Sequence, residues 1–182
     1  ESSAFPQLEA RIDLGGERGG MTWSAYSVAH IDKKDFSGSD TEEGEPEILY
    51  GRAIQMGAKL NVQRVTLQGN VYRGRAIGHQ MGQLTQFGDI RSTGAWAQVG
   101  YHLTPRWSAW LFTGMGNPNN DDARALASTV RLKNQSRAGM IRYAAGPVSL
   151  GLEWLGNTTE WAEGDSPTRK GNQFVLSALY SF

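Results

Sequence analysis

The sequence predicts an all-β fold, an antiparallel transmembrane β-barrel to which this chain supplies about nine strands. Three observations predict it. Apolar residues alternate with polar or small residues at a period of two along most of the chain. The alternating segments run for about 10–15 residues, whereas strands in soluble domains usually have about 5–6 and a tilted transmembrane strand needs about 9–11. The connections between the segments are alternately short and long.

The first four segments already show two unlike faces. In the first segment, Leu8 and Ile12 belong to an apolar set, whereas Glu9 and Arg11 belong to a polar set. The third segment sets Ile54, Met56, Ala58, Leu60 and Val62 against Gly51, Ala53, Gln55, Gly57, Lys59 and Asn61, and the fourth sets Val65, Leu67 and Val71 against Thr66, Gln68, Asn70 and Tyr72. The ranges of the four segments are 5–15, 20–32, 48–62 and 64–78.

The later segments alternate less evenly. The eighth sets Val148, Leu150, Leu152 and Trp154 against Ser149, Gly151, Glu153 and Asn157. The sixth and seventh leave the faces open, because Arg137 and Arg142 cannot both lie on one side of a strand. No window shows a clear helical period, and 121–129 is expected to form at most one helical turn in a loop. The ranges of the last five segments are 91–103, 106–116, 131–145, 148–159 and 171–182.

The connections predict which end of each strand faces which side of a membrane. In outer-membrane barrels the turns on the periplasmic side are short and the loops on the outer side are long. We therefore expect the long connections to face outward and the short ones to face the periplasm. The short connections are 16–19, 63, 104–105 and 146–147, and the long ones are 33–47, 79–90, 117–130 and 160–170.

Composition narrows the class of protein. The chain has 182 residues, enough for a single domain spanning 1–182. It carries 18 basic and 18 acidic residues and no formal net charge, which argues against a nucleic-acid partner. It has no cysteine, so disulfides and thiolate metal sites are excluded. No apolar run is long enough for a membrane-spanning helix.

Aromatic residues are expected near the segment ends on the apolar face, as in the girdles that mark the two membrane interfaces. They are Trp23, Tyr101, Trp107, Trp154, Phe174, Tyr180 and Phe182.

Four stretches resemble the C-terminal part of Gram-negative general porins. They are "GAWAQVGYHLTPRWSAWLFTGMGNPNNDDA" (94–123), "RLKNQSRAGMIRY" (131–143), "LGLEWLGNTTEW" (150–161) and "QFVLSALYSF" (173–182). The resemblance implies a bacterial outer-membrane channel for the passive diffusion of small hydrophilic solutes and ions, without enzymatic activity or cofactor. It also implies that Tyr180 and Phe182 form the terminal-strand signal for the barrel-assembly machinery. No constriction loop is recognisable.

The strand count leaves alternatives open. Bacterial single-chain barrels have an even number of strands, so nine strands favour part of a larger barrel. The alternative is a closed eight-stranded barrel, with 5–15 as a lead-in that does not span, acting as an adhesin or structural anchor. An outer-membrane hydrolase is a further alternative, for which His79 near Asp89 is the candidate pair, although no GxSxG motif marks a nucleophile.

Charged residues on the polar face are the candidate pore-lining residues, because charges along a water-filled lumen set its local field. The competing interpretation is structural salt bridges inside a narrow, filled barrel. No metal site is expected, since the three histidines are scattered, and the acidic stretches 37–47 and 117–123 lack the ligand spacing of a calcium loop. The expected partners are outer-membrane lipid and lipopolysaccharide, the barrel-assembly machinery and, as one form of assembly, a homotrimer. The candidate pore-lining residues are Glu9, Arg11, Asp13, His30, Asp32, Lys59, Arg64 and Glu153.

Overall fold

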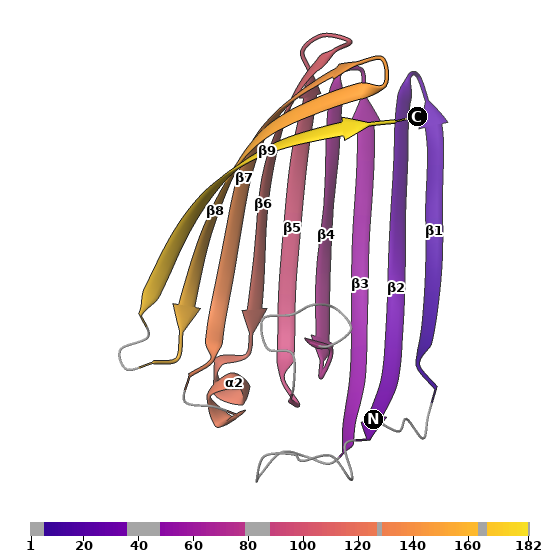
Figure 1. The fold of residues 1–182 in the computed structure, drawn as a ribbon. Helices are drawn as coiled ribbons and strands as arrows, with labels where there is room; N and C mark the ends of the chain where they lie inside the picture. The colour runs from indigo at the N-terminus through magenta and orange to yellow at the C-terminus, as the bar shows by residue number, and fades with distance from the viewer. Residues whose placement is uncertain (1–5, 36–47, 79–87, 127–128, 164–166, 182) are drawn as a thin grey trace.

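Nine β-strands form one antiparallel sheet in the computed structural model, which describes residues 6–35, 48–78, 88–126, 129–163 and 167–181. Each strand pairs with its neighbours in the chain, so the spatial order is β1 to β9 (Figure 1). The strands are β1 (Leu8–Arg18), β2 (Met21–Asp35), β3 (Ile48–Val62), β4 (Val65–Arg75), β5 (Arg91–His102), β6 (Trp107–Pro118), β7 (Arg131–Ala145), β8 (Val148–Trp161) and β9 (Thr168–Tyr180).

The predicted strand boundaries are confirmed to within a few residues, and the differences have local causes. β1 continues to Arg18, so the first turn is Gly19–Gly20 rather than 16–19. Both glycines have positive φ, 58° and 76°, and this backbone conformation carries no penalty for a residue without Cβ. β1 also pairs with β2 along its whole length, so the alternative in which 5–15 is a lead-in outside the sheet is wrong.

Short turns and long connections lie at opposite ends of the sheet. Figure 1 shows the short turns at the top, and the strand ends that the longer connections join, with the helix α2 (Asn120–Leu126), at the bottom. Among the described residues, no helix is both long and apolar enough to cross a membrane.

Register assigns every strand residue to one of two faces. Partners such as Leu8 and Ile31, or Leu152 and Leu176, lie on the same side of the sheet. Within the described residues, the large exposed hydrophobic side chains all lie on this side, except Leu179 and Leu103, the second of which lies in a turn. We call this side the apolar face. The register also separates the two ambiguous arginines, because Arg137 lies on the apolar face and Arg142 on the other.

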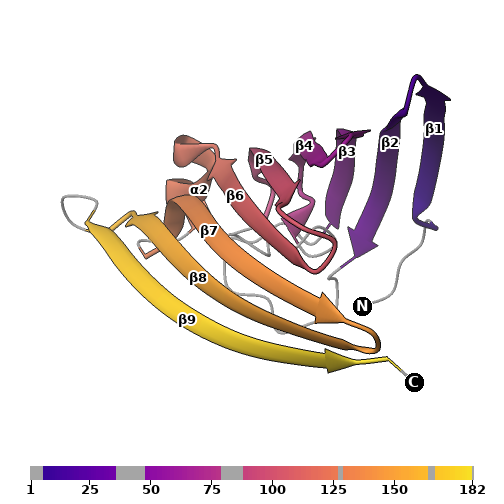
Figure 2. The same ribbon diagram turned by 90° about the horizontal axis from the view of Figure 1, so that it is seen from above.

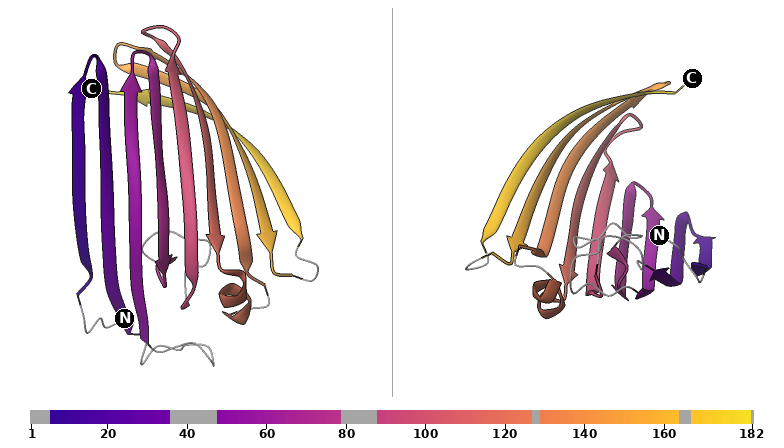
Figure 3. Two further views of the ribbon diagram at one scale, coloured as in Figure 1. Left: turned by 180° about the vertical axis from the view of Figure 1, so that it is seen from behind. Right: turned by 60° about the horizontal axis from the view of Figure 1, so that its bottom comes forward.

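The opposite side, the polar face, is more enclosed. Its buried polar residues include His30, Asp32 and Lys34 on β2 and Asn70 on β4. The sheet is strongly curved, so that β1 and β9 point in different directions (Figures 2 and 3). Side chains on the concave side of a curved sheet are crowded together, which accounts for the lower exposure of the polar face.

Helix α2 lies at the end of the sheet where the long connections are. Asn119 caps it by accepting a hydrogen bond from the backbone N–H of Asp122 at 3.0 Å. Asp122 also accepts hydrogen bonds from the Arg91 side chain at 2.8 and 2.9 Å, and these lower the pKa of Asp122 to about 2. The pair therefore stabilises this end at neutral pH, and the contribution is lost as the pH falls through about 2. Beneath the helix lies a small apolar cluster of Ile90, Ala123, Val130, Leu132 and Ala162, with Leu126 against it.

The orientation of the sheet in a membrane can be tested by single-cysteine labelling, because the chain has no native cysteine. Asp121→Cys on exposed α2 is expected to react with an impermeant thiol reagent on intact cells. Arg106→Cys, in the exposed turn between β5 and β6, is expected to react only after the outer membrane is opened. Labelling of Arg106→Cys alone on intact cells would reverse the orientation.

Candidate pore wall

Seven of the eight predicted pore-lining residues lie on the polar face, and one does not. Arg64 lies in the turn between β3 and β4, where its guanidinium points to the Leu103 carbonyl at 3.4 Å. Whether the seven line a pore stays a prediction. They are Glu9, Arg11 and Asp13 on β1, His30 and Asp32 on β2, Lys59 on β3 and Glu153 on β8.

A line of charged groups runs from β1 along β2. Nδ1 of His30 lies 3.1 Å from Oε1 of Glu9, and Nε2 of His30 lies 3.6 Å from Oδ1 of Asp32. The other oxygen of Asp32 lies 2.7 Å from Nζ of Lys34. The side chains of His30, Asp32 and Lys34 are each at most 6 % exposed. Buried charges are costly unless they are paired, so these contacts hold the groups in fixed positions.

Lys34 links two strands that are not neighbours. Its ammonium donates a hydrogen bond at 2.8 Å to the Ala76 carbonyl just beyond β4, so the side chain crosses β3. It crosses at Gly51, where an added Cβ would lie 1.6 Å from Oδ1 of Asp32 and 3.1 Å from Nζ of Lys34. Glycine at this position therefore makes room for the Asp32–Lys34 pair, which sequence analysis missed because Lys34 falls in a predicted loop.

Next to this line, Arg11 and Asp13 form a two-bond ion pair on β1. Nε and Nη2 of Arg11 donate to the two carboxylate oxygens of Asp13, both at 2.7 Å. The Arg11 guanidinium also lies 4.5 Å from the ring centre of Tyr26, a cation–π distance. The hydroxyl of Tyr26 accepts a hydrogen bond from the Asn70 side chain at 2.7 Å. The charged and aromatic groups of β1, β2 and β4 thus form one connected wall.

Three aromatic rings of the polar face lie flat over glycines of the adjacent strand. Tyr26 lies over Gly57, Tyr72 over Gly94 and Trp110 over Gly100, and in each pair the two residues are direct register partners. A Cβ at each glycine would lie 2.3–2.4 Å from the ring. The large rings therefore lie against the adjacent strand, at glycines that leave room for them.

The second half of the polar face is more aromatic and carries fewer charges. Trp96 and Phe112 have ring centres 6.1 Å apart, and Phe112 also lines a hollow of about 270 Å³ with Trp110, Met140 and Glu153. Charged groups of the polar face concentrate on β1 to β3. The polar face therefore has a charged part on these strands and an aromatic part, which contains Glu153.

The structure also describes parts of the predicted hydrolase pair and of the acidic stretches. Asp89, the candidate partner of a catalytic histidine, is bound by Arg75 at the sheet end, and His79 lies outside the described residues. The acidic stretch 117–123 forms the end of β6 and the start of α2, and no group of three metal-ligating side chains occurs within the described part of the chain. The whole acidic stretch 37–47 lies outside that part, as does Phe182.

The predicted aromatic girdle is partly correct. Trp23, Tyr101, Trp107 and Tyr180 lie on the apolar face near the short-turn end. Trp154 and Phe174 also lie on that face, but they pair with each other in the middle of β8 and β9, so their predicted position near segment ends is wrong.

Comparison with known proteins finds a solved structure of similar architecture. No family model and no curated protein matches the chain. Among solved structures, the crystal structure of the outer membrane channel DcaP of Acinetobacter baumannii is similar, with a TM-score of 0.78 and 20 % sequence identity. The similarity covers 100 % of this chain and 53 % of that one, so the chain spans about half the length of the channel. The similar protein is an outer membrane channel, and the nine strands of this chain have the fold of part of an outer-membrane β-barrel.

Proposed function

We propose that the chain forms part of the wall of a water-filled outer-membrane channel for passive diffusion of small hydrophilic solutes and ions. The observation that carries this proposal is the separation of the two faces. Exposed Leu, Ile, Val and aromatic residues cover most of one side, and charged groups of β1 to β3 lie on the other. A strand that faces lipid needs the apolar surface, and a strand that lines an aqueous path needs the polar one.

The sheet edges support a larger barrel. β1 and β9 each pair with a single strand in the described structure. Unpaired backbone N–H and C=O groups cannot face hydrocarbon without a cost of several kcal/mol each. We therefore propose that further strands complete the barrel, consistent with a similar channel of nearly twice this length. A wide lumen also agrees with the flat aromatic rings on the polar face, since a narrow, filled barrel would place side chains into that space.

The chemistry of such a wall is electrostatic filtering, without covalent steps. Lys59 is exposed on the polar face and makes no hydrogen bond or ion pair with another described residue. Arg11 and Asp13 are also exposed, but they compensate each other. Lys59 on β3 and Arg142 near the short-turn end of β7 are thus the exposed cations of the polar face that are placed to attract anions, whereas Glu153 acts in the opposite sense.

Lys59→Glu is expected to shift the selectivity of the channel toward cations. Charges at the wall bias the local ion concentration within a screening length of about 10 Å at 0.1 M salt and about 3 Å at 1 M, so the shift should shrink at high salt. The measurement is the reversal potential of the whole protein in a planar bilayer under a salt gradient. Arg106→Glu, with the same charge change in an exposed turn, is the control.

The outcomes separate the candidate functions. A conducting protein whose reversal potential is the same for Lys59→Glu and the parent would place Lys59 outside the ion path. A parent protein that folds but does not conduct would favour the adhesin or anchor function. Recognition of Tyr180 and Phe182 by the assembly machinery and a homotrimeric state remain predictions.

A further inference from the structure

A cluster of cations interrupts the apolar face at the long-connection end of β2 to β5. Arg52, Arg75 and Arg91 are direct register partners in one row across β3, β4 and β5, and Arg73 lies two residues from Arg75 on the same face. Lys33 lies beside them on β2, 5.8 Å from the ring of Tyr50. We call these five residues the outer basic patch.

The arginines of the patch are only partly compensated within the described structure. Like charges directly opposite each other on a sheet are destabilising, and this row contains two such pairs. Asp89 binds Arg75 and Asp122 binds Arg91. Arg52 and Arg73, in contrast, make no hydrogen bond or ion pair with any other described residue. Two arginines on a surface otherwise suited to hydrocarbon therefore need an anion from elsewhere.

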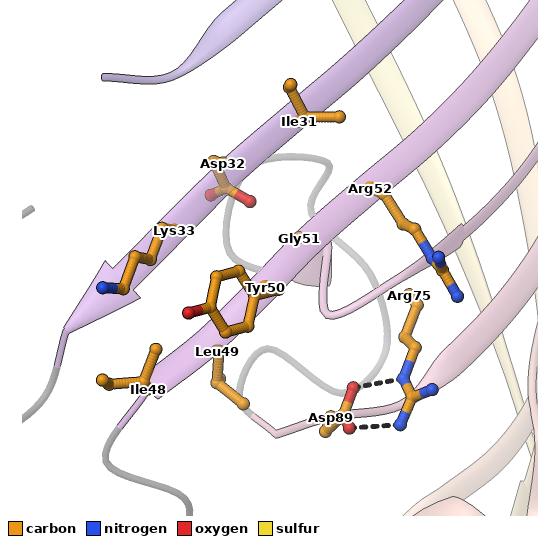
Figure 4. Close-up of a pocket in the computed structure, with 10 residues that line it drawn as sticks. All are labelled: Ile31, Asp32, Lys33, Ile48, Leu49, Tyr50, Gly51, Arg52, Arg75 and Asp89. Atoms are coloured by element: carbon orange, nitrogen blue, oxygen red, sulfur yellow. Dashed lines mark hydrogen bonds and ion pairs between the residues drawn. The ribbon is translucent and has the colours of Figure 1, made fainter. Parts of the chain in front are cut away.

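The arginines surround hollows on the surface. One hollow of about 360 Å³ is lined by Arg52, Arg73, Arg75 and Arg91, together with Ile31 and Ile54. An adjoining hollow of about 710 Å³ shares Arg52 and Arg75 and adds Lys33, Tyr50 and Ile48. Figure 4 shows the second hollow, with Arg52 and Arg75 near each other and Asp89 bound to Arg75. Together they present cations beside apolar side chains.

Apolar protein surface continues from the patch toward the short-turn end of the sheet. Met56 and Val71 follow on β3 and β4, and both are half exposed. Beyond them an almost wholly apolar hollow of about 570 Å³ runs over Ala25, Ala58, Gly69 and Ala97, between Trp23 and Leu111. A ligand that satisfies both regions carries anionic groups at one end and hydrocarbon chains at the other.

We propose that the outer basic patch binds the phosphate groups of an outer-leaflet glycolipid, of the lipid A type found in lipopolysaccharide, with its acyl chains on the adjoining apolar face. Arginine suits this role because its planar guanidinium pairs with phosphate through two hydrogen bonds. The patch lies at the end of the sheet that faces outward in the proposed function, on which this inference rests. The occupant is a lipid rather than a free anion because the cations lie beside hydrocarbon surface.

Binding can be measured with the whole protein in detergent, using diphosphorylated lipid A as the probe. Arg52→Ala/Arg73→Ala, which removes the two cations without a described partner, is expected to weaken binding at least tenfold. Arg52→Lys/Arg73→Lys should recover part of the loss. Dephosphorylated lipid A should bind the parent at least tenfold more weakly than the diphosphorylated form. Arg137→Ala, an exposed arginine elsewhere on the apolar face, is the matched control and should bind as the parent does.

Three results would overturn the proposal. The first is equal binding of diphosphorylated lipid A by the parent and the Arg52→Ala/Arg73→Ala variant. The second is competition by millimolar inorganic phosphate, which would indicate a site for a free anion. The third is a change of oligomeric state in Arg52→Ala/Arg73→Ala with unchanged lipid binding, which would assign the patch to a contact between copies. Conductance of each variant is recorded in parallel. A parent protein that does not conduct contradicts the proposed function, whereas a protein that conducts but fails to bind lipid contradicts only this inference. If Arg52→Ala/Arg73→Ala does not fold, the proposal is tested by the lipid affinity of Arg52→Lys/Arg73→Lys and by the affinity of the parent for dephosphorylated lipid A.

Discussion

Lys34→Ala is expected to lower the free energy of unfolding by about 3–5 kcal/mol, because it removes the ammonium that is paired with the buried Asp32 carboxylate. Asp32 and Lys34 are 5 % and 6 % exposed at the side chain and lie 2.7 Å apart. The substitution also removes the hydrogen bond at 2.8 Å to the Ala76 carbonyl, and with it the link between β2 and β4. Unfolding by urea of the whole protein in lipid vesicles, followed by tryptophan fluorescence, gives the value.

A double variant separates the unpaired charge from the lost packing. Asp32→Leu/Lys34→Met removes both charges and keeps apolar volume, and replacing both members of a buried pair in this way is often nearly neutral. We therefore expect it to cost less than half as much as Lys34→Ala alone. A cost for Lys34→Ala below about 1 kcal/mol, the range of exposed pairs, would mean that water reaches the pair and that it is not a fixed part of the wall.

Much of the fold is predictable because a membrane-facing strand is determined by its own sequence. In β3 the apolar residues from Ile54 to Val62 recur at every second position, and the predicted range 48–62 is the observed one. Boundaries fail where turn chemistry offers two choices. Glycines stand on both sides of Glu17 and Arg18, and the turn forms at Gly19–Gly20, leaving Glu17 and Arg18 in β1.

The site was harder to predict because its contacts cross strands. Asp32 was a predicted pore-lining residue, but its partner Lys34 fell in a predicted loop, and the fit of the pair over Gly51 and the bond from Lys34 to the Ala76 carbonyl depend on the register of β2, β3 and β4. The flat rings over Gly57, Gly94 and Gly100 likewise require the register, since each ring and its glycine lie on different strands.

The outer basic patch, in contrast, carried a signal that sequence reasoning missed. Arg52 has the same parity as Ile54 and Met56, and Arg73 and Arg75 have the parity of Leu67 and Val71. The period of two alone therefore places these arginines on the apolar face. Their alignment across β3, β4 and β5 becomes visible only with the register.

Leu152→Arg is expected to destabilise the protein by about 2–4 kcal/mol, the cost of arginine on the lipid face of a barrel near the bilayer midplane. Leu152 lies on the apolar face opposite Leu176 and Ile141, and its side chain is 55 % exposed. It stands four residues from Val148 at the short-turn end of β8. At about 3.3 Å per residue and a tilt of about 40°, this places it roughly 10 Å into an apolar band about 25 Å tall.

Glu153→Arg is the matched control, because it introduces the same side chain at the adjacent position of the same strand. Glu153 lies on the polar face and makes no hydrogen bond or ion pair with another described residue, so arginine there keeps access to water if the lumen is aqueous. We expect its unfolding free energy to fall by less than about 1 kcal/mol, as for surface substitutions away from the core. Similar losses for the two variants would contradict the facing of β8, because residues of opposite parity cannot both contact lipid. A large loss for Glu153→Arg alone would place hydrocarbon on the polar face and invert the proposed channel.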